Sequence, residues 1–377
     1  MFKQRPAAVF LAASILLALA APALAPAPAE AQRPRAPVER SLRDVLGGVP
    51  FTAADSMAQR IVERLDFDSY REIIAGLASF GDREQGTERN ARAIDWIEQQ
   101  LQSWGYETGR IQYYVVCQRG RCTNAQSSEA EAELREEVYA TKVGSITPGE
   151  MYILGAHMDG RGGGEAVNDD ASGTALVMEI ARALSGPDVR TDRSIRFALW
   201  NNEETGLNGA RAYVEQRAPL QGIEDPPGSG RYPEPRWVGM IQHDMMMWDH
   251  GNPVMDTQVL DADVDIEFQL VSEKAAESAE LALVLLNANR KFATDYPAVL
   301  SNGMRSTDSG AFQDLVASVS LRENRRVYET GNAANPHWHQ PTDLLVTFSE
   351  ADYRLGFNAT QTTMGAVALL AGARIQP

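Results

Sequence analysis

The stretch MYILGAHMDGRGGGEAVNDDASG, residues 151–173, determines both the fold and the expected site. It opens with an apolar run typical of a buried strand, and His157 and Asp159 follow directly. A glycine-rich loop at 160–164 leads to the polar cluster NDD at 168–170 and then to an apolar helical pattern. A strand, then His and carboxylates, then a helix is how α/β enzymes place metal ligands at strand ends. We therefore expect this stretch to supply half of a two-metal hydrolytic site.

Strand and helix patterns alternate along the rest of the chain. The expected strands are 106–116, 138–142, 152–154, 194–200, 238–242, 298–300 and 316–321, and the expected helices are 67–77, 90–104, 175–184, 207–214 and 354–371. This alternation predicts an α/β fold with a mostly parallel mixed sheet covered by helices on both faces. We expect the acidic run 129–137 to be a solvated loop or a short helix, and 263–289 to contain helical patterning.

Unusual polar residues follow two more of the expected strands or lie in a late loop. They are Glu203, Glu204, Asp244, His337 and His339. The carboxyl ends of parallel strands meet at one edge of a sheet, so we expect these residues to converge with those of the opening stretch. A lone His or Asp after a strand is more often a cap or a hydrogen-bonding group. The joint pattern is what indicates a metal site.

The N-terminus has the pattern of a secretory signal peptide. Lys3 and Arg5 precede an apolar run at 7–20, and an Ala-x-Ala tripeptide stands at 29–31. The run is too short for a good membrane span, and no cysteine lies near for a lipid anchor. We expect cleavage of residues 1–31, a secreted or periplasmic protein, and no membrane anchor.

The mature chain is expected to begin with a poorly ordered segment at 32–50, which is rich in proline and arginine at its start. The formal net charge of −16 becomes −17 when the signal peptide, with its single net positive charge, is removed. Such acidity argues against nucleic acid or an anionic membrane as a partner. The only two cysteines, Cys117 and Cys122, lie close together, and export favours a disulfide between them over a metal pair.

Five motifs resemble those of the M28 metallopeptidases: GAHMDG, VNDDASGTA, NNEETGLNGARAY, the Asp of IQHDMM, and PHWHQPTD. The resemblance runs from about residue 65 to the C-terminus. It implies a phosphorylase/hydrolase-like zinc exopeptidase fold in a single domain over 51–377, two zinc ions per chain, and peptide substrates.

The resemblance implies a role for each motif residue. His157 and Asp244 bind the first zinc, Glu204 and His339 bind the second, Asp169 bridges both, Glu203 is the general base, and Asp159 supports His157. Two close cations need a bridging carboxylate to offset their repulsion, with His and carboxylates at the outer positions. The family often has a cis peptide after the bridging aspartate, here between Asp169 and Asp170, and Asp170 is not expected to be a ligand.

Two positions depart from the family pattern. The family commonly has Ser-Asp-His where this chain has Thr307-Asp308-Ser309, so a substrate contact differs, and Asp308 either binds the substrate amine or has a structural role. Trp338 stands where the family often has Tyr, which puts that residue's oxyanion role in doubt.

The remaining histidines have other expected roles. His337 is the fallback ligand, because alternate strand residues face the same way. His243 is expected to point away from the site, and His250 to lie in a surface loop.

The motifs therefore predict an exported di-zinc exopeptidase, most simply an aminopeptidase. One alternative is a glutaminyl-cyclase-like acyltransferase with a single zinc, whose final motif tends to read Trp-His, as Trp338-His339 does. Another is a non-catalytic domain of the same fold, which loss of ligands would mark, and the sequence retains every expected ligand.

Overall fold

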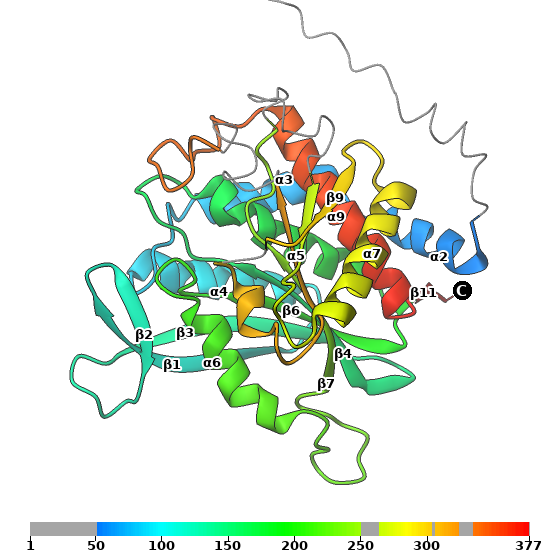
Figure 1. Cartoon of the computed structure of the whole chain (residues 1–377), viewed down its shortest axis with the longest axis horizontal. Helices are drawn as coiled ribbons and strands as arrows, with labels where there is room; N and C mark the ends of the chain where they lie inside the picture. Colours follow the sequence, from blue (N-terminus) through cyan, green and yellow to red (C-terminus); the bar gives the residue numbers. More distant parts are fainter. Residues whose placement is uncertain (1–50, 250–263, 304–305, 324–334, 377) are drawn as a thin grey trace, which may run out of the picture. The chain divides into compact units, whose positions relative to one another are not determined.

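A nine-stranded mixed sheet organises the chain, with the strand order β2-β1-β3-β6-β4-β7-β10-β8-β9 (Figure 1). The computed structural model describes residues 51–249, 264–303, 306–323 and 335–376. The expectations for 1–31, 32–50 and His250 lie outside these residues. The strands are β1 (Thr108–Gln118), β2 (Arg121–Ala125), β3 (Glu133–Lys142), β4 (Thr147–His157), β6 (Arg193–Trp200), β7 (Arg236–His243), β8 (Val264–Glu267), β9 (Ala298–Ser301) and β10 (Ser318–Glu323). A separate two-stranded sheet pairs β5 (Val189–Arg190) with β11 (Arg374–Ile375).

The four central strands β6, β4, β7 and β10 run parallel, and antiparallel pairing begins at β3 on one side and β8 on the other. The register aligns their carboxyl ends. His157 at the end of β4 pairs with Trp200 of β6, while His243 of β7 pairs with Ala156 of β4 and Leu321 of β10. Residues that follow these strands therefore meet at one edge of the sheet.

Four of the seven described α-helices begin where a polar side chain caps free backbone N–H groups. The helices are α2 (Ala53–Val62), α3 (Phe67–Ala78), α4 (Glu88–Ser103), α5 (Ser172–Leu184), α6 (Asn208–Arg217), α7 (Ala275–Phe292) and α9 (Glu350–Leu370). Thr52, Asp66, Thr87 and Ser349 cap α2, α3, α4 and α9 in this way. Among the described residues, no helix has the length and apolar character needed to cross a membrane.

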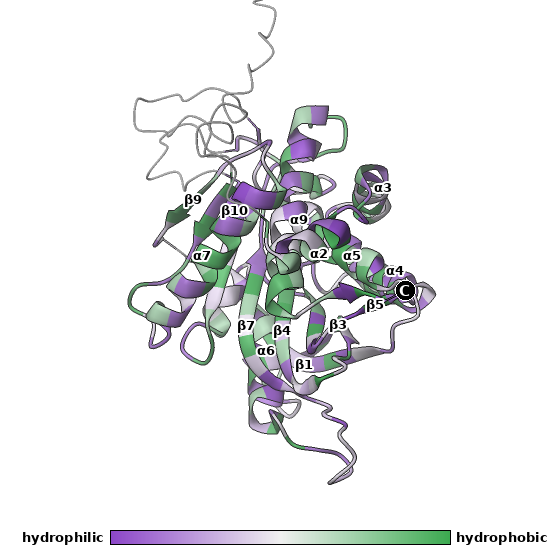
Figure 2. Ribbon diagram, turned by 90° about the vertical axis from the view of Figure 1, so that its right-hand side faces the viewer, coloured by the Kyte–Doolittle hydropathy of each residue, from purple (hydrophilic) through white to green (hydrophobic). Residues whose placement is uncertain are grey.

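Both faces of the sheet are covered, and the central strands are apolar (Figure 2). Alternation along β4 sends Leu154 and Ala156 into one apolar cluster and Met151 and Ile153 into the other. The first cluster lies under α2, α3, α4, α5, α7 and α9, and the second lies under α6. The sheet covered on both faces confirms the expected fold class.

One local expectation was wrong. The second half of the acidic run 129–137 belongs to β3, which pairs with β1 and β6 inside the sheet. Glu136 forms an ion pair with Arg110 at 2.9 Å there, and buried Glu137 accepts the backbone N–H of Asn201 at 3.2 Å. The expected helical patterning within 263–289 is confirmed by α7, and residues 264–267 before it form β8, which pairs with β9 and β10.

Candidate metal centre

His157, at the end of β4, is the first element of the site and is only 1% exposed. Its Nδ1 lies 2.9 Å from the backbone carbonyl of Asp159. A carbonyl oxygen can only accept, so Nδ1 carries the proton and Nε2 is free to bind a metal. Nε2 faces Asp169 Oδ1 at 3.2 Å and Asp244 Oδ1 at 3.8 Å.

Asp159 supports the site differently from the expectation. Its carboxylate lies 3.8 Å from His157 Nδ1, so the backbone carbonyl, rather than the side chain, orients the ring. The carboxylate instead accepts the backbone N–H groups of Glu203 at 3.1 Å and Glu204 at 3.4 Å. Asp159 therefore connects the end of β4 to the loop after β6.

Two groups of ligand atoms meet at Asp169. His157, Asp169 and Asp244 form one, and Asp169, Glu204 and His339 form the other, each with its atoms within 4.8 Å of one another. Asp169 gives Oδ1 to the first group and Oδ2 to the second, where His339 Nε2 lies 3.1 Å away. His339 Nε2 also lies 2.8 Å from Glu204 Oε2.

The backbone around Asp169 is fixed by neighbouring carboxylates. The Asp169–Asp170 peptide is cis, as the resemblance implied. Buried Asp170 accepts the N–H groups of His157 at 3.2 Å, Gly173 at 2.9 Å and Met245 at 3.2 Å. It belongs to neither ligand group, so the structure places it outside the candidate metal ligands, as predicted.

Asp244 extends β7 and is oriented by Arg322 of β10. Arg322 Nη2 donates to Asp244 Oδ2 at 2.6 Å, which leaves Oδ1 directed at His157. Both side chains are buried. The charge pair therefore positions one ligand oxygen while satisfying the other.

Glu203 and Glu204 have distinct positions in the loop after β6. Glu204 lies in the second ligand group, and its buried Oε1 has no hydrogen-bond partner among the described residues. Glu203 lies in neither group, yet it lines the same cavity. One glutamate is thus available as a ligand and the other as an acid–base group.

The electrostatics of the side chains favour a cation at this point. Burial raises the pKa of Glu203 well above its ordinary value, and burial raises that of Glu204 to about 7. Burial alone would lower the pKa of His157, but the facing carboxylates, Glu203 foremost, raise it well above its ordinary range. Burial alone would raise the pKa of Asp169, but the hydrogen bonds of His157 and His339 hold it low.

The donor set fits zinc. Each group offers one imidazole nitrogen and two carboxylates, which are common zinc ligands, and a shared carboxylate suits a pair of metals. Glu204 Oε1 is buried without a hydrogen-bond partner among the described residues, which also fits a role in binding a cation.

A cavity of about 920 Å³ opens over both groups. Trp338 lines it, is 50% exposed, and packs against His339 with ring centres 4.3 Å apart. Asp308 is buried, accepts a hydrogen bond from Gln242 at 3.2 Å, and is not among the residues that line the cavity. Its expected substrate contact therefore has no support in the structure.

The two other described histidines lie outside the ligand groups. His337, the alternative ligand, has its Nδ1 2.9 Å from Thr342 Oγ1 and is therefore hydrogen-bonded within its own loop. Buried His243 lies between the carbonyl of Gly155 at 3.0 Å and Thr363 Oγ1 at 2.9 Å. It points away from the site, as expected.

The sequence profile of peptidase family M28 matches residues 137–357, more than half of the chain. The chain belongs to this family. The match contains both candidate ligand groups and Glu203.

Curated relatives share parts of this M28 chain. A probable zinc metalloprotease of Leptosphaeria maculans is 31% identical over 179 residues, which are 43% of this chain and 40% of that protein. A probable lipoprotein aminopeptidase of Mycobacterium tuberculosis is 38% identical over 89 residues, 24% of this chain and 17% of that protein. The chain thus spans less than half the length of these two relatives.

Solved structures share the M28 fold over most of their length. The aminopeptidase from Aneurinibacillus sp. strain AM-1 has a TM-score of 0.60 at 17% identity, over 84% of this chain and 96% of that one. A glutaminyl cyclase of Macrostomum lignano has a TM-score of 0.64 at 14% identity, over 87% and 95%. At these identities the likeness shows the fold alone.

Sequence reasoning missed several supporting residues. Arg322 and Asp343 orient the candidate ligands Asp244 and Asp169. Arg83 is fully buried and donates to five backbone carbonyls, among them those of Met158 and Ala166 on either side of the glycine-rich loop. Asp343 stands in the motif PHWHQPTD, and Arg83 lies within the stretch from residue 65 that the resemblance covers, which was the available signal.

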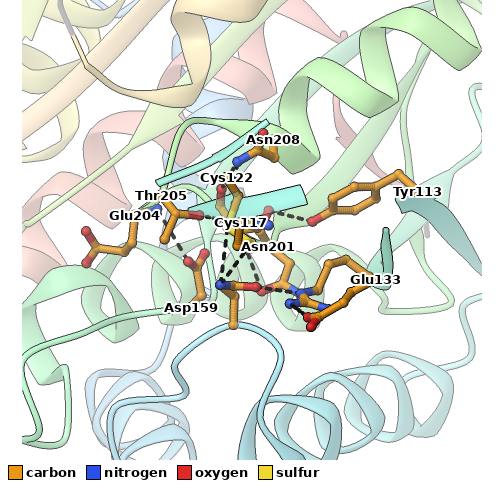
Figure 3. Close-up of a disulfide and its surroundings, with 12 residues drawn as sticks. Tyr113, Cys117, Cys122, Glu133, Asp159, Asn201, Glu204, Thr205 and Asn208 are labelled. Carbon is orange, nitrogen blue, oxygen red and sulfur yellow. Dashed lines mark hydrogen bonds and ion pairs between the residues drawn. A yellow bond between two sulfur atoms is a disulfide. The ribbon is translucent and has the colours of Figure 1, made fainter. Parts of the chain in front are cut away.

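The expected disulfide between Cys117 and Cys122 is present and crosses the β1–β2 hairpin. Figure 3 shows Thr205 and Glu204 beside it. The N–H of Cys122 donates to the carbonyl of Thr205 at 2.9 Å. The hairpin is therefore joined to the loop that carries the two glutamates.

Proposed function

We propose that this chain is an exported metallo-exopeptidase that holds two zinc ions and removes N-terminal residues from peptides. The observation that carries the proposal is the sharing of Asp169 by two ligand groups, with Glu203 left free on the same cavity. That arrangement combines two cation positions with an acid–base group, as metal-assisted hydrolysis requires.

In this proposal His157, Asp169 and Asp244 hold one zinc, and Asp169, Glu204 and His339 hold the other. Zinc supplies, when bound, polarisation of the scissile carbonyl and a lowered pKa for water. Glu203 takes a proton from the attacking water and delivers it to the leaving amine. Trp338 borders the cavity and offers a ring face to the substrate.

Exopeptidase action is supported by the carboxylates that stay outside the ligand groups. Glu203 and Glu323 line the cavity beside the candidate metal positions, where they can accept hydrogen bonds from a peptide N-terminal amine. The curated aminopeptidase relative supports this direction. Export is supported by the N-terminal pattern and by the disulfide, because disulfides persist mainly in oxidising compartments.

The test is metal analysis and hydrolysis by the purified protein lacking residues 1–31. We expect two zinc ions per chain and hydrolysis of amino-acid p-nitroanilides that is lost with a chelator and restored by zinc. A chain that binds no zinc, or that cleaves no N-terminal residue when loaded, would contradict the proposal.

A second candidate is a glutaminyl-cyclase-like acyltransferase with one zinc. It is favoured by the contact of Trp338 with His339 and by the fold shared with glutaminyl cyclases. One zinc per chain, together with cyclisation of peptides that begin with glutamine, would identify this activity instead.

A further inference from the structure

Four arginines line the cavity: Arg322, which is paired with Asp244, and Arg121, Arg161 and Arg211. The last three are exposed, and within the described part of the chain none of them forms an ion pair. They gather here although the whole chain carries a formal net charge of −16. Scattered surface arginines need no functional explanation, but three unpaired ones around one cavity of an acidic protein indicate a function for the positive charge.

Each arginine comes from a different element around the loop 203–207. Arg161 follows β4, and its Nη1 donates to the carbonyl of Glu204 at 3.3 Å. Arg121 begins β2, directly before Cys122, whose N–H is bonded to Thr205. Arg211 lies in the first turns of α6, which directly follows this loop.

The hairpin and α6 are held together, so this arrangement does not depend on the arginine side chains. Asn124 Nδ2 donates to the carbonyl of Asn208, the first residue of α6, at 3.1 Å. The disulfide closes the hairpin next to Arg121. These contacts therefore fix the backbone of Arg121 and Arg211 beside the loop 203–207.

The cavity therefore has two regions, the candidate metal ligands and a set of exposed guanidinium groups. A short peptide has a group suited to each region, an amine at one end that can coordinate a metal and a carboxylate at the other. A volume of about 920 Å³ is enough for a ligand of a few residues, since small-molecule sites run to about 1,000 Å³. Arginine pairs well with carboxylates through paired N–H donors.

We propose that Arg121, Arg161 and Arg211 bind a substrate carboxylate, so that the preferred substrates are peptides with a carboxylate beyond the scissile bond. This rests on the proposed aminopeptidase function and adds the substrate class. The carboxylate comes from the C-terminus of a dipeptide or tripeptide or from an acidic side chain in the second position. Both sources present the same chemistry to the arginines.

The experiment compares kcat/KM for matched substrates with the zinc-loaded protein. Leu-Ala against Leu-Ala-amide tests the terminal carboxylate, and Leu-Glu-amide against Leu-Gln-amide tests the side chain. We expect a preference of about tenfold for the charged member of at least one pair, the size of one good charged hydrogen bond. The preference should fall at high salt, because exposed charges are screened.

Variants test whether the arginines cause the preference for substrates with a carboxylate. In Arg121→Gln and Arg211→Gln we expect the charged-to-neutral ratio of kcat/KM to fall toward one, mainly through KM. Arg60→Gln is the matched control, because Arg60 is an exposed arginine of α2 that does not line the cavity. Its ratio should equal that of the wild type.

Each outcome has one meaning. Equal cleavage of both members of each pair, or a preference that survives in both arginine variants, overturns the carboxylate proposal while leaving the peptidase intact. Failure to cleave any substrate, including leucine p-nitroanilide, overturns the proposed function itself. Calorimetric binding of Leu-Ala and its amide to the Glu203→Gln variant gives the same comparison without turnover.

Discussion

The carboxylate of Asp343 accepts a hydrogen bond from the backbone N–H of Asp169 at 3.1 Å. Its other oxygen accepts the N–H of Asn168 at 2.8 Å. Asp343 also follows His339 closely in the same loop. One side chain therefore connects Asp169, the candidate ligand shared by both groups, to the segment that carries His339.

The Asp343→Asn variant should bind zinc more weakly at both positions. An asparagine accepts only one of the two N–H bonds and turns an N–H₂ group toward the other donor. Loss of a group that orients ligands typically costs about 10–100-fold in metal affinity. A competition titration with a chromogenic chelator measures this, and Asp68→Asn, an exposed aspartate of α3, is the control. Unchanged affinity would show that Asp169 is held without Asp343.

The same substitution should have different effects at the two adjacent glutamates. Glu203→Gln should keep both zinc ions and lower kcat by at least about 100-fold, since general-base catalysis contributes about 10²–10⁴-fold. Glu204→Gln should instead lose zinc from the second group. Zinc per chain and kcat, measured on the same samples, distinguish the two results. If Glu203→Gln lost zinc and Glu204→Gln kept both ions, the two proposed roles would have to be exchanged.

Replacing Arg83 should destabilise the fold more than replacing any exposed arginine. Arg83→Met removes donors from five backbone carbonyls, and each buried group left unpaired costs about 1–3 kcal/mol. We expect the free energy of unfolding to fall by at least about 3 kcal/mol in urea titrations. Arg92→Met on the exposed face of α4 should change it little. A small effect at Arg83 would mean that the loop after β4 is held by other contacts.

The ion pair between Asp55 and Lys291 should make stability fall in acid. Burial alone would raise the pKa of Asp55, but hydrogen bonds from Lys291 at 2.6 Å and from Thr52 at 2.8 and 2.9 Å hold it below its ordinary value. A carboxyl with a lowered folded-state pKa stabilises the fold above its unfolded pKa, near ~3.9, and this contribution disappears as pH falls through the folded pKa.

The comparison is urea unfolding of metal-free wild type and Asp55→Asn. The wild type should be more stable by about 1–3 kcal/mol at pH 7, and the difference should shrink below about pH 4. A difference independent of pH would exclude the charged form of Asp55 as its source.

Removing the disulfide should have a modest effect on stability and a larger one on selectivity. A loop this short contributes roughly 2 kcal/mol by the chain-entropy argument. Replacing both Cys117 and Cys122 with serine should therefore lower the free energy of unfolding by about that amount. It should also reduce the preference for carboxylate substrates, because Arg121 follows the turn that the disulfide closes. An unaltered substrate preference would mean that the hairpin is rigid without it.

The candidate ligands could be predicted because each follows an apolar strand or stands in a distinct motif. The orientation of His157 by a backbone carbonyl could not, since it depends on how the chain turns after β4. The burial of Glu137 could not be predicted either. An acidic run is expected to be solvated unless the strands that pair with it, here β1 and β6, are known. The contact of Asp308 with Gln242 could not be predicted either, because it depends on how the short helix Asp308–Ala311 packs against β7.

The distribution of ligands along the chain also determines when the centre can form during synthesis. His157 and Asp169 emerge from the ribosome early, whereas His339 and Asp343 emerge after almost all of the sheet has been made. A nascent chain that ends before this late loop has neither the second ligand group nor the carboxylate that fixes the shared ligand. In the proposed two-zinc site, the second metal position could therefore be completed only late in synthesis.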